Sequence, residues 1–88
     1  MEKIKMYDVE SSNVKQIGHD GNDLYVRFKN DGVYKYMEVP ENIFDGLLNA
    51  ESVGQMLNKD IKRLYECERI WDDDPIYTII VPNENKEE

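Results

Sequence analysis

The sequence predicts a small α+β domain in which a short antiparallel β-sheet packs against two helices. Its length of 88 residues suits one domain, 1–88. A β-hairpin is indicated over residues 24–39, where two segments of alternating character flank an Asn-Asp-Gly turn signal. Two stretches with helical spacing of apolar residues follow the hairpin. We therefore expect a sheet built on this hairpin, with flanking strands on either side of it in the sequence.

The strand before the hairpin is expected to be short and irregular. It covers residues 13–19, where Val14 and Ile17 are the apolar positions and Gly18 closes the segment. The polar cluster at residues 20–23 then predicts a turn.

The first arm of the hairpin alternates with period 2, as a half-buried strand does. Its apolar side chains are Leu24, Val26 and Phe28, and those between them are Tyr25, Arg27 and Lys29. The returning strand covers residues 33–39.

The length of the hairpin loop decides which way Tyr34 and Tyr36 point. A three-residue loop, 30–32, with Gly32 in the left-handed conformation, pairs Phe28 with Tyr34 and Val26 with Tyr36, and places both tyrosines on the core face. A two-residue loop, 31–32, turns both to the opposite face, because one residue of slip inverts every side chain. We favour the three-residue loop, which keeps Lys35 off the apolar face.

Two helices are expected next. Pro40 ends the strand, and a first helix opens at Glu41 with an apolar stripe of Ile43, Phe44, Leu47 and Leu48. Ser52 and Gln55 match a capping box for a second helix. The buried face expected for that helix consists of Val53, Leu57, Ile61, Leu64 and Tyr65.

The carboxyl-terminal quarter is expected to contain, over residues 66–82, the end of the second helix, an acidic turn and a last strand. Residues 72–75, Asp-Asp-Asp-Pro, stop a helix because the carboxylates oppose its negative end and proline cannot continue it. Residues 76–81 are rich in β-branched side chains and predict the strand. Residues 83–88 form a polar tail that we expect to fray.

The net charge of −8 is unevenly distributed. Residues 1–65 carry 11 acidic and 9 basic side chains, whereas residues 66–88 carry 8 acidic and 2 basic ones. The chain contains no apolar run long enough for a membrane helix, and residues 1–6 lack the apolar stretch of a signal peptide, so we expect neither. Its single cysteine, Cys67, cannot form an internal disulfide, and we expect a cytoplasmic protein.

The residues do not predict an enzyme. His19 and Cys67 are single occurrences on different elements, with Cys67 expected on the last helical turn and His19 expected to cap a turn. Two such residues do not make a zinc site, and the acidic run at 72–74 lacks the spacing of a calcium loop. We expect no cofactor, no metal and no catalytic residues.

Two binding functions remain open. The first is nucleic-acid binding, preferably of RNA, by a sheet face and a cluster on the second helix. The candidate residues are Tyr25, Arg27, Lys29, Lys35, Lys59, Lys62 and Arg63. The second is binding of a protein partner by a module with an acidic C-terminal extension, and this extension is the best evidence for it. The six tyrosines, four methionines and one tryptophan are also types that favour interfaces, with Trp71 as the candidate anchor.

A set of short motifs in this order resembles the KTSC domain over residues 7–65. The motifs are Ser11-Ser12, Ile17-Gly18, the alternation of Leu24, Val26 and Phe28, Tyr34-Lys35-Tyr36, Val39-Pro40, Ala50, Ser52, Gly54, Asn58 and Ile61-Lys62. That family occurs at the carboxyl end of some lysyl-tRNA synthetases and as small stand-alone proteins, and Tyr34 and Tyr36 match its Tyr-x-Tyr motif. The resemblance implies a non-catalytic module for which RNA binding has been suggested. An aromatic side chain is common in the family where this sequence has His19.

Overall fold

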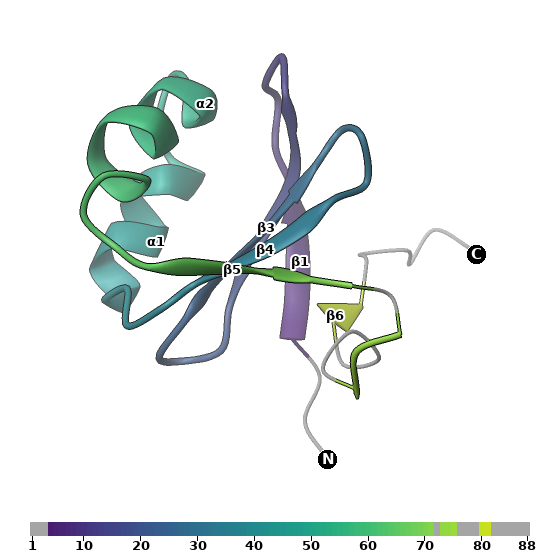
Figure 1. Ribbon diagram of the computed structural model, residues 1–88. Helices are drawn as coiled ribbons and strands as arrows, with labels where there is room; N and C mark the ends of the chain where they lie inside the picture. The colour runs from purple at the N-terminus through teal and green to yellow at the C-terminus, as the bar shows by residue number, and fades with distance from the viewer. Residues whose placement is uncertain (1–3, 72, 76–79, 82–88) are drawn as a thin grey trace.

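In the computed structural model, which describes residues 4–71, 73–75 and 80–81, one β-sheet is covered on one face by helices (Figure 1). The strand order is β5-β4-β3-β2-β1-β6, with β1 to β5 antiparallel and β6 parallel to β1. The elements in chain order are β1 (Ile4–Asp8), β2 (Val14–His19), β3 (Leu24–Phe28), β4 (Val33–Tyr36), α1 (Glu41–Leu48), α2 (Val53–Met56), the π-helical turn η1 (Leu57–Ile61), β5 (Cys67–Ile70) and β6 (Ile80–Val81). The predicted α+β class, with an antiparallel sheet and two helices, is confirmed.

Strand β1 was not predicted. Ile4 and Met6 are buried and Lys5 and Tyr7 are exposed, so the segment does alternate, although its charged residues obscure the pattern. β1 pairs with β2, which is the strand expected at residues 13–19.

The hairpin keeps the predicted faces but not the predicted register. Val26 pairs with Tyr34 rather than with Tyr36, a difference of two residues. The left-handed position belongs to Asp31, at φ 72°, and not to Gly32 as expected. Two hydrogen bonds of 2.8 Å close the loop. One runs from the amide of Asp31 to the carbonyl of Phe28, and the other from the amide of Phe28 to the carbonyl of Gly32. Because the shift is even, both tyrosines of the motif stay on the same face as Val26.

The two faces of the sheet have separate cores. Successive residues of β3 point to opposite faces, so Val26 belongs to the core under the helices and Tyr25 to the core on the other side. The helix-side core contains Val14, Ile17, Leu24, Val26, Tyr36, Val39, Phe44, Leu47, Val53, Leu57 and Ile61. The far-side core contains Ile4, Met6, Tyr25, Val33 and Ile70.

Helix α1 forms as predicted, directly after Pro40, and buries Phe44 and Leu47. Helix α2 is capped by Ser52, whose Oγ accepts from the amide of Gln55 at 3.3 Å. The amide of Lys62 then reaches back five residues to the carbonyl of Leu57 at 2.9 Å, which makes η1 a π-turn.

The π-turn explains why the predicted second helix is too long. The extra residue in the turn shifts the phase of the apolar spacing, so Leu64 is 72% exposed instead of buried. The chain then leaves the helix and residues 67–70 form β5, an edge strand paired with β4. The prediction that Cys67 lies on a helical turn is therefore wrong, since Cys67 begins an exposed strand.

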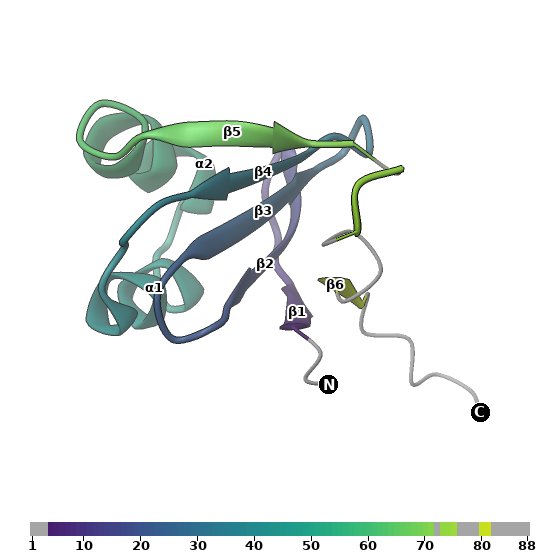
Figure 2. The same ribbon diagram turned by 60° about the horizontal axis from the view of Figure 1, so that its bottom comes forward.

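After β5 the chain crosses from one edge of the sheet to the other, because β5 and β6 are the two outermost strands (Figure 2). Residues 73–75 form the expected turn. Residues 80–81 confirm the end of the predicted last strand, whereas residues 76–79 and the tail at 83–88 lie outside the described residues. Among the helices that the structure describes, none has the length and apolar character needed to cross a bilayer.

Candidate functional site

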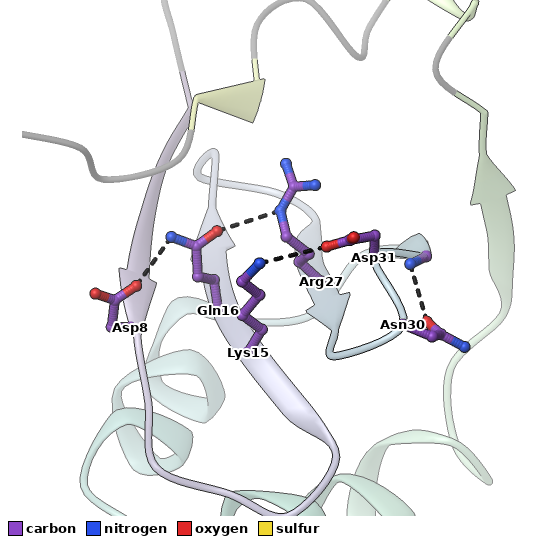
Figure 3. Close-up of polar contacts among 7 residues, drawn as sticks. Asp8, Lys15, Gln16, Arg27, Asn30 and Asp31 are labelled. Atoms are coloured by element: carbon purple, nitrogen blue, oxygen red, sulfur yellow. Dashed lines mark hydrogen bonds and ion pairs between the residues drawn. The ribbon is translucent and has the colours of Figure 1, made fainter.

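The sheet-face surface predicted for nucleic acid is not formed, because its two central residues are buried. Tyr25 is 1% exposed and Arg27 is 7% exposed, both on the face turned away from the helices. Arg27 Nε donates to Gln16 Oε1 at 3.2 Å, and Gln16 Nε2 donates to Asp8 Oδ1 at 2.9 Å, so a polar line crosses β3, β2 and β1 (Figure 3). These contacts hold the Arg27 side chain within the protein, so it is not exposed on the surface of the sheet.

Tyr25 is held in a similar way by the turn at residues 20–23. Its hydroxyl donates to Asp20 Oδ2 at 3.1 Å, and Asp20 Oδ1 accepts from the amides of Asn22 and Asp23 at 2.9 and 2.8 Å. Burial, followed by the charge of Asp20, raises the pKa of Tyr25 well above its ordinary value. Burial also raises the pKa of Asp20, but the hydrogen bonds from Asp23, Asn22 and Tyr25 outweigh it, so this pKa lies below 3.8.

The Asp20 turn predicts a specific acid sensitivity. A carboxyl whose pKa is depressed by folding stabilises the protein above its unfolded pKa, and this stabilisation is lost as the pH falls through the folded value. Asp20→Asn should lower the free energy of unfolding at pH 7 by about 1 kcal/mol, and the difference from wild type should shrink below about pH 3.8. Urea unfolding at pH 7, 5 and 3 measures this, with exposed Glu10→Gln as the control. A difference that is constant with pH would exclude this role of the Asp20 charge.

The predicted cations are dispersed. Lys29 is exposed in the hairpin loop, and Lys35 lies on the far face, paired with Tyr25 and Glu68. Lys59 and Arg63 are exposed on the helical side. The ammonium of Lys62 lies over an aromatic ring, 6.0 Å from the centroid of Phe28.

A cavity of about 440 Å³ opens on the helix side of the sheet, beside η1 and the edge strand β5. We call it the aromatic pocket; its lining residues are Phe28, Asn30, Tyr34, Tyr36, Lys62 and Cys67. Both tyrosines of the Tyr-x-Tyr motif therefore meet a cation and a thiol in one hollow. The volume is within the range of small-ligand sites.

Rings and cations continue from this pocket along β4 and β5. The rings of Phe28 and Tyr34 meet edge to face, with centroids 5.6 Å apart. Arg69 lies 5.4 Å from the Tyr34 ring and 4.1 Å from the Trp71 ring, and its Nη1 donates to the Tyr34 hydroxyl at 3.4 Å. We call this row, Lys62, Phe28, Tyr34, Arg69 and Trp71, the cation–aromatic strip.

Sequence reasoning missed Arg69 and Phe28 as site residues. Arg69 was expected in a helix, and only a strand at residues 67–70 places it opposite Tyr34. The strand signal is weak there, because β5 is four residues long and three of them are exposed polar or small side chains. Phe28 was expected in the core, and it lies only partly buried at the margin of the helix-side core.

Tyr36 is the most buried polar group of the pocket. Its side chain is 2% exposed, and the described residues provide no hydrogen-bond partner for its hydroxyl. Burial, followed by the nearby Cys67 and Tyr34, raises the pKa of Tyr36 to about 12. The hydroxyl thus keeps its proton near neutral pH.

A second hollow, of about 490 Å³, lies beside residues 64–66 and has acidic side chains in its lining. This acidic cleft is lined by Met37, Glu38, Leu64, Tyr65 and Glu66. The exposed side chain of Leu64 is thereby flanked by two carboxylates.

The two residues considered for catalysis are not brought together. His19, Leu24, Tyr36 and Cys67 form one row across β2, β3, β4 and β5. Three strand spacings, about 14 Å, separate the row's ends, which is too far for proton transfer between them. Among the described residues, no group of three or more His, Cys, Asp or Glu side chains could hold a metal ion.

His19 has a structural environment instead. Its ring stacks on Phe44 with centroids 5.4 Å apart. Nδ1 accepts from the amide of Gly21 at 3.0 Å, which leaves the proton on Nε2 to donate to the Val39 carbonyl at 2.6 Å. The imidazole ring of His19 thus makes a stacking contact of the kind that an aromatic side chain at this position would make. The hydrogen bond from the Gly21 amide agrees with the prediction that His19 caps a turn.

Comparison with known proteins identifies similar chains. Residues 10–65 match the profile of the KTSC domain. A protein of Tsukamurella paurometabola is 42% identical over 59 residues, which are 65% of this chain and 88% of that protein. The lysine–tRNA ligase of Nostoc punctiforme is 35% identical over 63 residues, which are 69% of this chain and 11% of the ligase. The crystal structure of a KTSC domain protein from Yersinia pestis matches with a TM-score of 0.73 and 30% identity, covering 77% of this chain and 99% of that protein.

Proposed function

Because this chain belongs to the KTSC domain family, we propose that it is a non-catalytic module that binds single-stranded RNA through the cation–aromatic strip. The observation that carries the proposal is the unbroken row of contacts from Lys62 to Trp71. Unpaired bases stack on aromatic rings and on guanidinium planes, and cations beside those rings attract the phosphates. This row replaces the buried sheet face as the RNA-binding surface.

The charge around the aromatic pocket supports the proposal. None of the described residues that line the pocket is acidic, and the row contributes Lys62 and Arg69, whereas the acidic residues 73–74 follow Trp71 at the other end of the row. Glu68 neighbours Arg69 in the sequence, but it pairs with Lys35 on the opposite face of the sheet. The net charge of −8 opposes RNA binding as a whole, so we expect weak binding that falls steeply with salt.

The family relationship adds a second support. One relative is named a lysine–tRNA ligase, and this chain matches 11% of its length. A tRNA-dependent enzyme is a setting in which an added RNA-binding surface is useful. The proposal for this chain still rests on the strip, because the rest of the ligase has no counterpart here.

The test is a titration of labelled mixed-sequence single-stranded RNA, followed by fluorescence anisotropy at low and moderate salt. Lys62→Ala and Arg69→Ala should each weaken binding about 5- to 50-fold, the range for a lost stacking or cationic contact of 1–2.3 kcal/mol. Lys59→Ala and Arg63→Ala remove the same charge from exposed positions outside the strip and serve as matched controls. Absence of binding by the wild type at low salt, or equal losses in strip and control variants, would contradict the proposal.

The acidic cleft favours a second candidate function, binding of a protein partner with a basic and apolar segment. An exposed leucine between Glu38 and Glu66 offers one apolar contact and two charges to such a segment. Co-purification from the native host distinguishes the candidates. Leu64→Ser should release a partner held by the cleft and leave RNA binding unchanged, whereas Arg69→Ala should do the reverse.

A further inference from the structure

The aromatic pocket has an excess of hydrogen-bond donors. The buried Tyr36 hydroxyl lacks a partner among the described residues, and a buried polar group of this kind normally finds one in a ligand or an ordered water. Asn30 Oδ1 already accepts from the amide of Gly32 at 2.9 Å, so its NH₂ group and one lone pair remain for a ligand. Lys62 can only donate, and the thiol of Cys67 is a weak donor.

This donor excess discriminates between ligands. A group that presents carbonyl oxygens pairs with the donors of Tyr36, Asn30 and Lys62, whereas an amino group adds a further donor to a pocket in which donors already outnumber acceptors. A ligand without such oxygens leaves donors of the pocket unpaired, and unpaired polar groups in a site discriminate strongly between similar ligands. The pocket is therefore suited to a flat ring with carbonyl groups and without exocyclic amines.

We infer that the aromatic pocket accepts a single uracil base of the bound RNA; this inference rests on the proposed function. Uracil is the RNA base that has two carbonyl oxygens and no exocyclic amino group, unlike adenine, cytosine and guanine. The rings of Phe28 and Tyr34 provide the apolar wall for the base. Lys62 and Arg69, on either side of those rings, are placed for the flanking phosphates.

The hydroxyl of Tyr36 is the group that reads the base. A tyrosine hydroxyl is protonated near neutral pH, so it can donate to a carbonyl oxygen. Tyr34 also carries a hydroxyl, which accepts from Arg69 Nη1 at 3.4 Å and is thereby held in the cation–aromatic strip. We assign the ring of Tyr34 to the wall of the pocket and the hydroxyl of Tyr36 to the bond with the base.

The experiment compares labelled oligouridine, oligoadenosine and oligocytidine of eight nucleotides by anisotropy at low salt. The wild type should bind oligouridine about 5- to 20-fold more tightly than the other two, as expected for one or two hydrogen bonds. Tyr36→Phe should reduce this preference to about twofold, chiefly by weakening oligouridine binding. Tyr7→Phe, which removes a tyrosine hydroxyl outside the pocket and the strip, is the control and should retain the preference.

Each outcome separates the inference from the function on which it rests. Equal binding of the three oligonucleotides, or a preference that survives Tyr36→Phe, would overturn the uracil inference and leave the strip as an RNA-binding surface. Absence of binding to all three would overturn the proposed function itself. Urea unfolding of Tyr36→Phe should show no loss of stability, because the hydroxyl removed has no partner among the described residues.

Discussion

Replacing Tyr36 with alanine is expected to lower the free energy of unfolding by about 3–5 kcal/mol, the cost of removing a large ring from a packed core. Tyr36 is 2% exposed and belongs to the helix-side core with Leu24, its partner across β3 and β4. A domain of 88 residues has a thin core, and such a loss is a large part of its total stability. Urea unfolding followed by circular dichroism is the measurement.

The other tyrosine of the motif is the internal comparison. Tyr34 is only partly buried at the margin of the same core, so Tyr34→Ala should cost about 1–2 kcal/mol. Tyr36→Phe keeps the ring and should cost less than either truncation. If Tyr36→Ala loses under about 1 kcal/mol, the ring is not part of the core and the described pairing of β3 with β4 is wrong.

The hairpin illustrates how far the sequence could predict this fold. Period-2 alternation decides which face of the sheet a side chain occupies. The faces of Tyr34 and Tyr36 were predicted correctly, because the actual register differs from the predicted one by an even number of residues. The register itself depends on which loop residue adopts the left-handed conformation. Glycine is the usual choice, but Asp31 takes it here, where its carboxylate also bonds Lys15 Nζ at 3.3 Å.

The second helix shows where local patterns fail. Ser52 and Gln55 predicted its start correctly, because a cap depends on neighbouring residues alone. Its end depends on the π-turn at residues 57–61 and on the pairing of β5 with β4, and pairing with a distant strand leaves little local signal. The predicted apolar face accordingly holds for Val53, Leu57 and Ile61 and fails at Leu64.

The candidate site could be predicted only in parts. Lys62, Tyr34, Tyr36 and Trp71 were each identified for separate reasons, and the fold brings them to one surface. Tyr25 and Arg27 were assigned to an exposed face because alternation cannot tell a solvated face from one with a second core. That second core is formed with residues of β1 and β5, and neither strand was predicted.

Replacing Gly18 with alanine is expected to destabilise the protein by about 1–3 kcal/mol, the range for inserting atoms into a filled space. Gly18 lies in β2 between Met6 of β1 and Tyr25 of β3. A Cβ at Gly18 would lie 2.6 Å from the carbonyl oxygen of Lys5 and 2.7 Å from the sulfur of Met6. The sulfur can rotate away, but the carbonyl belongs to the backbone, so β1 itself must move.

The same substitution elsewhere in the chain provides the control for Gly18→Ala. Gly46 lies inside α1, where an added Cβ meets only the mobile methyl group of Met56 at 3.3 Å. Gly46→Ala should therefore be neutral or stabilising by up to about 1 kcal/mol, since alanine favours the helix. Urea unfolding and hydrogen exchange of the β1 amides measure the two variants. Loss of β1 protection in Gly18→Ala alone would place the damage at the contact between β1 and β2. Equal stability of the two variants would instead mean that β1 does not pack this closely on β2. It would also contradict the far-side core in which Ile4 and Met6 of β1 bury Tyr25.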